Sequence, residues 1–188
     1  AILSAVATAL TLVAFGPYLK EIWLRKARPH VFSWIIWGLT TLLAFVAQLA
    51  GQGGLGAWPI GFSALISFGV AGLSYFRQGD VAVTRMDWVF LLAALSSLLA
   101  WYFTSDPLWT VVMLTVVDLL GFGPTFRQVY NDPHSESAMF YALFTVRNVV
   151  AIAALERYSV TTVLFPAAIS VGCVGLILII GIRRIGVG

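Results

Sequence analysis

Long apolar runs separated by short polar segments repeat along the whole chain. A helix that spans a bilayer needs about 20 mostly apolar residues, so each run predicts one transmembrane helix. The segments between the runs are too short to fold separately, and residues 1–188 are therefore expected to form a single membrane domain. The seven predicted spans are roughly residues 1–24, 32–50, 57–77, 86–104, 107–130, 137–155 and 160–182.

Polar and turn-forming residues mark several of the predicted helix ends. Ser33 is predicted to cap the second helix, because a serine hydroxyl accepts a hydrogen bond from the free N–H groups of a first turn. Pro59 falls in the first turn of the third helix, where its missing N–H is harmless. Gln48 lies near the end of the second helix and is expected to be solvated. The first run lacks a basic start and ends in Lys and Arg, which predicts a retained helix and not a cleaved signal.

The composition excludes an ordinary soluble domain. Hydrophobic residues make up 60% of the chain and charged residues 10%, whereas roughly a quarter of the residues of a soluble domain are charged. The single cysteine, Cys173, cannot form an internal disulfide. No Gly-rich phosphate loop, nucleophile motif or cluster of metal ligands occurs in the sequence. An all-α membrane protein is therefore expected, without enzymatic activity, cofactor, metal or nucleic-acid partner.

One motif occurs twice in the chain. Residues 15–33 and 122–137 share Phe-Gly-Pro, a cation, an aromatic residue, Pro-His and Ser. The two copies lie 107 residues apart up to the aromatic residue and 104 apart from Pro-His onward. Self-similarity on this scale is a property of the whole architecture. It predicts two three-helix repeats, over residues 1–77 and 107–184, joined by a linker helix over residues 86–104 that has no counterpart.

The lysines and arginines predict the orientation in the membrane. With seven spans, nine of the eleven fall on one side, Arg157 falls on the other, and Arg147 lies inside a helix. Cytoplasmic loops are enriched in Lys and Arg, so the N-terminus is predicted outside and the C-terminus in the cytoplasm. The linker helix then makes the two repeats run parallel, as in several transporters. The nine are Lys20, Arg25, Lys26, Arg28, Arg77, Arg85, Arg127, Arg183 and Arg184.

The chain resembles the SWEET and PQ-loop transporter superfamily. Pro17 and Pro124 stand where the Pro-Gln or Pro-Thr motif of that family stands, and Pro166 matches the proline that precedes a sugar-binding asparagine in SWEETs. The resemblance implies a seven-helix 3+1+3 fold and alternating access by two three-helix bundles. The chain differs from the family in several positions: Tyr18 and Thr125 replace the glutamine, Ile60 and Ala167 the paired asparagines, and Ile152 a substrate-stacking tryptophan.

Three polar residues stand at mid-depth in the second repeat. Asp118 lies about 11 residues into the fifth helix, some 16 Å at ~1.5 Å per residue, and Arg147 and Asn148 lie at a similar depth in the sixth. Their repeat counterparts are Thr11, Leu43 and Ala44. Intramembrane charges usually face a pathway or each other. The functional interpretation is a substrate site in which Asp118 and Arg147 pair across a cavity and Asn148 offers its amide. The alternative is a structural ion pair.

Two prolines inside predicted helices are candidate hinge residues. Pro17 and Pro124 interrupt helices, as hinges for alternating access or as static kinks that improve packing.

Trp34, Trp37 and Tyr141 lie in the cytoplasmic halves of their helices, as an inner gate or an interfacial aromatic belt. Ser63 and Ser170 lie on the third helix of each repeat, as substrate-lining groups or as small residues for close helix packing.

A carrier for a small polar solute, such as a sugar or an amino acid, is the function that these patterns favour. It would act as a facilitator or a proton-coupled carrier within the lipid bilayer. Two alternatives stay open: a receptor that binds a ligand in the same cavity, and an accessory subunit of a larger membrane complex. A homo-oligomer is compatible with each of them. The resemblance does not decide among these, because the same fold serves different functions.

Overall fold

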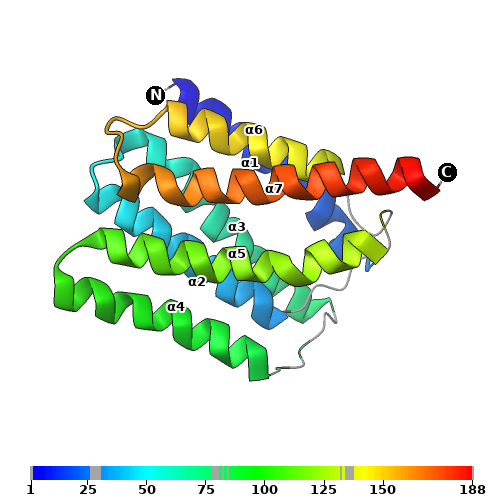
Figure 1. Cartoon of the computed structure of the whole chain (residues 1–188), viewed down its shortest axis with the longest axis horizontal. Helices are drawn as coiled ribbons and strands as arrows, with labels where there is room; N and C mark the ends of the chain where they lie inside the picture. The colour runs from blue at the N-terminus through cyan, green and yellow to red at the C-terminus, as the bar shows by residue number, and fades with distance from the viewer. Residues whose placement is uncertain are drawn as a thin grey trace.

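The computed structural model describes residues 2–25, 31–77, 81, 83, 85–131, 133 and 138–187. Over these residues the chain is all-helical, and the seven predicted helices are confirmed (Figure 1). A short 3₁₀ turn, η1 (Gly54–Ala57), precedes the third helix. The helices are α1 (Ile2–Trp23), α2 (Val31–Ala50), α3 (Trp58–Phe76), α4 (Arg85–Thr104), α5 (Pro107–Asn131), α6 (Ala138–Ala153) and α7 (Val160–Val187).

Five segments are long and apolar enough to cross a membrane, which is consistent with a multi-pass integral membrane protein. Two further helical segments, Pro107–Leu120 and Ala138–Ala153, are apolar but shorter. Large apolar side chains cover the outside of the bundle; Leu65 and Leu92, for example, are 64% and 61% exposed. A lipid environment favours such a surface. The five segments are Ile2–Lys20, Val31–Ala50, Gly54–Phe76, Arg85–Thr104 and Val160–Ile185.

The helix boundaries differ from the predicted ones by one or two residues at most ends, and by five residues at the end of α7. α2 begins at Val31, so Ser33 lies inside the helix and the prediction that it caps α2 is wrong. α7 continues to Val187, five residues beyond the predicted end, because the apolar run is extended by a turn that carries arginines. Pro59 lies in the first turn of α3, as predicted.

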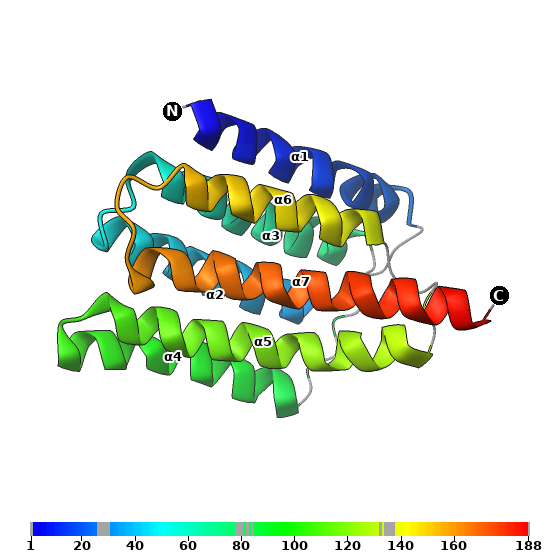
Figure 2. The same cartoon turned by 45° about the horizontal axis from the view of Figure 1, so that its top comes forward.

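The helices alternate in direction between two ends of the bundle (Figures 1 and 2). At the N-terminal end, α2, α4 and α6 finish and α3, α5 and α7 begin; the C-terminal end has the opposite helix ends. α3 packs against α1 and α2, and α7 packs against α5 and α6. We call α1–α3 the first triplet and α5–α7 the second. The triplets meet where α1 packs on α6 and α2 packs on α5, and α4 covers α5 and α2.

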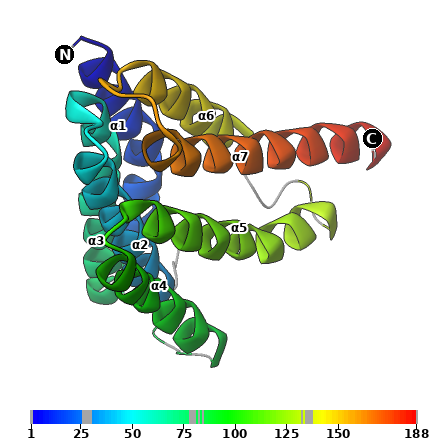
Figure 3. The same ribbon diagram turned by 60° about the vertical axis from the view of Figure 1, so that its left-hand side comes forward.

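The two triplets diverge toward the C-terminal end. Figure 3 shows α5 and α7 running away from α1, α2 and α3 in that direction. The larger apolar core joins α2 and α3 to the second triplet, around buried residues such as Leu114 and Leu176. A smaller core, around Phe15, Ile22 and Val70, lies within the first triplet. Phe144 of α6 packs against both cores.

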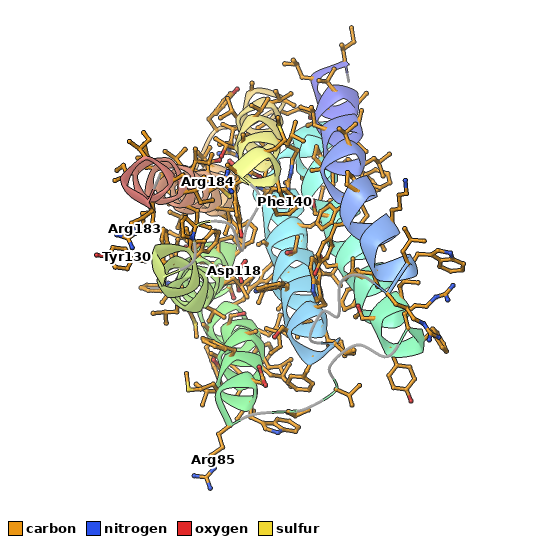
Figure 4. The ribbon with its side chains drawn as sticks, turned by 90° about the vertical axis from the view of Figure 1, so that its right-hand side faces the viewer. Arg85, Asp118, Tyr130, Phe140, Arg183 and Arg184 are labelled. Atoms are coloured by element: carbon orange, nitrogen blue, oxygen red, sulfur yellow. The ribbon has the colours of Figure 1, made fainter. Side chains whose placement is uncertain are left out.

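An arginine is stacked on an aromatic ring at the C-terminal end of each triplet. In the first, the Arg77 guanidinium carbon lies 3.7 Å from the centroid of the Trp23 ring. In the second, Arg183 lies 4.5 Å from the Tyr130 ring, and its Nε donates to the Tyr130 carbonyl at 3.0 Å (Figure 4). The repeat spacing pairs Arg77 with Arg184, but Arg184 instead donates to the carbonyl of Pro133 at 3.0 Å. Each stack ties the first helix of its triplet to the third.

Candidate functional site

A cavity of about 600 Å³ lies between the two triplets. Side chains from α1, α2, α3, α5, α6 and α7 line it. Its wall includes mid-helix residues of the second triplet and extends to Met139 and Trp34, near the first turns of α6 and α2. The cavity thus reaches toward the C-terminal end, where the triplets diverge. Its polar lining residues include Thr41, Ser63, Ser67, Asp118, Arg147 and Asn148.

Asp118 is the only carboxylate among the described residues that line this cavity. It is 9% exposed, and it points into the interior of the bundle from α5 (Figure 4). The side chain of Thr40, on α2, interacts with the carboxyl group. One of the two carboxyl oxygens, Oδ1, is buried and has no hydrogen-bond partner. A buried carboxylate oxygen in this state can accept a hydrogen bond from a ligand in the cavity.

Arg147 and Asn148 bring unused donors to the same cavity. Arg147 is 2% exposed, and its guanidinium carbon lies 4.4 Å from the centroid of the Phe144 ring. Its Nε and Nη1 atoms have no hydrogen-bond partner, and neither has Nδ2 of Asn148. Cys173 of α7 lines the same cavity.

The predicted ion pair between Asp118 and Arg147 is not present among the described residues. Both side chains line one cavity, as predicted, but each has turned toward other neighbours. The carboxyl group of Asp118 meets Thr40, and the guanidinium of Arg147 stacks on Phe144. The two charges are therefore separately available within the same space, which a direct ion pair would prevent.

Aromatic rings form the part of the wall nearer the C-terminal end. Phe15 of α1 makes edge-to-face contacts with Trp34, Phe140 and Phe144, with ring centroids 6.1, 6.0 and 5.4 Å apart. These contacts join α1 to α2 and to α6, on both sides of the boundary between triplets. Phe15, Phe140 and Phe144 were not predicted to be site residues. The signal available for Phe15 was its place in the repeated Phe-Gly-Pro motif.

The three predicted gate residues all line the cavity. Trp34 and Tyr141 are each 9% exposed, too buried for an interfacial belt, whereas Trp37 is 39% exposed. Trp34 and Trp37 touch edge to face, with ring centroids 5.2 Å apart. The gate hypothesis is compatible with these positions and stays a prediction.

The serines and prolines that were predicted as site residues have different positions relative to the cavity. Ser63 and Pro17 line the cavity. Ser170 is buried and donates to the Pro166 carbonyl at 2.8 Å, and it is outside the set of described residues that line the cavity. Pro124 lies within α5, which changes direction in its last turns (Figure 1), but its side chain is outside the described part of the chain.

Hydrogen bonds between the triplets close the N-terminal end of the bundle. Gln48 is 1% exposed, and its Nε2 donates to the Thr162 carbonyl at 2.6 Å. The expectation that Gln48 is solvated is therefore wrong. Two further bonds join the α2–α3 turn to Glu156: the Leu55 N–H donates to Glu156 Oε1 at 3.1 Å, and the Glu156 N–H donates to the Gly53 carbonyl at 3.2 Å.

Two glycines allow this close approach. Gly54 has φ +58°, a left-handed conformation that favours glycine. A Cβ atom at Gly54 would overlap the Glu156 carboxylate, and one at Gly56 would overlap the backbone of Leu155. A side chain at Gly56 would separate the two triplets at the N-terminal end, because the atoms that it would overlap belong to the backbone.

No group of three or more His, Cys, Asp and Glu side chains that could hold a metal ion occurs among the described residues. His30 and His134, which belong to the repeated Pro-His motif, lie outside the described ranges.

Comparisons with protein-family models, with curated proteins and with solved structures found no match to this chain. The resemblance to the SWEET and PQ-loop superfamily therefore stays a prediction from the sequence motifs.

Proposed function

We propose that the protein is a membrane carrier for a small polar solute, working by alternating access of two three-helix bundles. The observation that carries the proposal is the cavity between the triplets, whose walls hold buried donors and acceptors without partners. Buried polar groups are normally satisfied, and exceptions call for an explanation. A solute that completes the missing hydrogen bonds of Asp118, Arg147 and Asn148 supplies one.

The different states of the two ends support alternating access. The N-terminal end is closed by hydrogen bonds between the triplets, through Gln48 and Glu156. Toward the C-terminal end the triplets diverge, and the cavity wall extends in that direction. A structure closed at one end with a cavity reaching toward the other is expected for one state of a carrier. The opposite state would break the Gln48 and Glu156 bonds.

The helix contacts favour the 3+1+3 arrangement. In each triplet the third helix packs on both others, and the triplets meet through two corresponding pairs, α1 with α6 and α2 with α5. We propose that all seven helices span the membrane, with the N-terminus outside and the C-terminus in the cytoplasm. On this proposal the C-terminal end of the bundle faces the cytoplasm and the cavity is directed inward.

Topology can be tested by labelling in sealed cells. A cysteine at Ser105, which is exposed at the N-terminal end, should react with an impermeant reagent added outside. A cysteine at Val83, 47% exposed at the other end, should react only after the membrane is opened. The buried native Cys173 sets the background in the wild type. Labelling of Val83→Cys in intact cells would overturn the proposed orientation.

Transport itself is tested with purified protein in proteoliposomes. Uptake of a mixture of labelled sugars and amino acids should exceed that of empty liposomes for at least one solute. Binding without uptake would favour the receptor, and co-purification with other membrane proteins without binding would favour the accessory subunit. Thr41→Cys, on the cavity wall, should be labelled from the cytoplasmic side and protected by the transported solute.

A further inference from the structure

We infer that the cavity binds a solute that carries both a carboxylate and an ammonium group on an apolar, preferentially aromatic, body. The inference rests on the proposed function and narrows its substrate class. It depends on three features of one cavity: separate opposite charges, unused hydrogen-bonding atoms of each kind, and an aromatic wall. A neutral sugar needs neither of the two charges.

The carboxylate is assigned to Arg147 and Asn148. A guanidinium offers five N–H donors and no acceptor, so it recognises oxyanions. Two of the three guanidinium nitrogens of Arg147 have no partner, and the amide nitrogen of the adjacent Asn148 has none either. Both residues are at least 98% buried, so bulk water does not compete freely for these donors. Three unused donors on consecutive residues provide for the two oxygens of one carboxylate.

The ammonium group is assigned to Asp118. Its Oδ1 atom is a buried acceptor without a partner. An acceptor on α5 and donors on α6 that line one cavity fit a zwitterion. A solute with a single charge would leave the opposite charge of the protein unpaired in the cavity.

The apolar body is assigned to the aromatic part of the wall. Phe15, Phe140 and Phe144 form a connected group of rings, and Ile60 adds an apolar side chain to the cavity wall. Aromatic rings prefer edge-to-face or offset partners, and a solute ring can add to such a group. The volume of about 600 Å³ lies within the range of small-molecule pockets, roughly 300–1,000 Å³.

Equilibrium binding to the purified full-length protein tests the inference with matched probes. L-Phenylalanine carries all three features, phenethylamine lacks the carboxylate, hydrocinnamate lacks the amine, L-alanine lacks the ring, and glucose lacks all three. L-Phenylalanine should bind at least about tenfold more tightly than phenethylamine or hydrocinnamate, since a hydrogen bond to a charged group is worth that much or more. Equal binding of glucose and L-phenylalanine, or no binding of any probe, would overturn the inference.

Variants assign each charge to its partner. Arg147→Gln should remove the preference for L-phenylalanine over phenethylamine, and Asp118→Asn the preference over hydrocinnamate. Arg85→Gln and Asp106→Asn remove exposed charges far from the cavity wall and should leave both preferences unchanged. Preferences that persist in a folded Arg147→Gln variant would overturn the assignment. If either variant fails to fold, the probe series on the wild type decides alone.

An uptake assay distinguishes a failure of the inferred ligand class from a failure of the proposed carrier function. Binding of L-phenylalanine without uptake into proteoliposomes would contradict the carrier and leave the ligand class intact. Uptake of glucose in preference to L-phenylalanine would support the carrier and overturn the ligand class.

Discussion

At the C-terminal end of the bundle, the first triplet stacks Arg77 on Trp23 and the second stacks Arg183 on Tyr130. Halfway along the helices the likeness ends. Asp118 in the second triplet corresponds to Thr11 in the first, which is buried and donates only within its own helix, to the Ala7 carbonyl.

The sixth helix shows the same difference. Arg147 and Asn148 correspond to Leu43 and Ala44, which belong to the apolar core. The shared aromatic stacks hold helices together, whereas the polar residues found only in the second triplet line the cavity. On the proposed function, an asymmetric ligand would meet polar groups from mainly one of the two triplets.

The largest effect is expected when Arg147 of the second triplet is replaced by leucine, the residue at the corresponding position, Leu43, of the first triplet. Arg147→Leu should lower uptake by about 10- to 100-fold, through the loss of hydrogen bonds to a charged group. Thermal stability should be unchanged or higher, because the variant removes a buried charge without an ionic partner. Thr11→Val is the matched control in the first triplet and should leave uptake within about twofold of wild type. Normal uptake by Arg147→Leu would show that the difference between the triplets is not functional.

The next effect concerns the turns at the N-terminal end, where Gly54 meets Glu156 and Gly56 meets the backbone of Leu155. Gly56→Val should hold this end apart, since overpacking typically costs about 1–3 kcal/mol. Uptake should fall several-fold, and Thr41→Cys should become reactive from outside. Gly69→Ala is the control, because a Cβ atom there meets nothing within 4 Å. Unchanged outside labelling of the Gly56→Val protein would contradict the closing role.

A smaller effect is expected from the repeated prolines. Pro124→Ala should slow uptake a few-fold without lowering the melting temperature, because proline inside a helix costs stability and alanine does not. Pro17→Ala should act in the same direction but less strongly, if the bend in the last turns of α5 contributes to movement. Initial uptake rates and thermal unfolding of the same preparations measure this. A large loss of stability with normal uptake per folded molecule would leave only a packing role.

The smallest effect should come from the aromatic stacks. Arg77→Gln and Arg183→Gln should each cost at most about 1 kcal/mol, the usual worth of an exposed cation–π contact. The Arg183 variant should be the more affected, since it also loses a backbone hydrogen bond. The two losses should add, because the stacks lie in different triplets. Strong coupling in a double-mutant cycle on thermal unfolding would show that the stacks communicate.

The helices could be predicted from the sequence because each is one apolar run. Asp118 and Arg147 stood out for the same reason, as charges inside such runs. Their lack of a mutual ion pair could not be predicted, since depth along a helix does not fix which neighbour a long side chain meets.

Contacts between the two triplets could not be predicted from the sequence. Gln48 meets a carbonyl 114 residues later, and no local pattern indicates that partner. Phe140 and Phe144 were missed because an aromatic residue facing a cavity and one facing lipid look alike in an apolar helix.

The hydrogen bonds that close the N-terminal end also bear on the free energy needed to open it. A typical intramolecular hydrogen bond contributes only about 0.5–1.5 kcal/mol net, and four described bonds cross this end, with Gln48, Leu55, Glu156 and Arg157 as donors. Their total is comparable to the roughly 4 kcal/mol released when a solute binds with millimolar affinity. A solute of this affinity would therefore offset the loss of these bonds and shift the ratio of the two conformations of such a carrier.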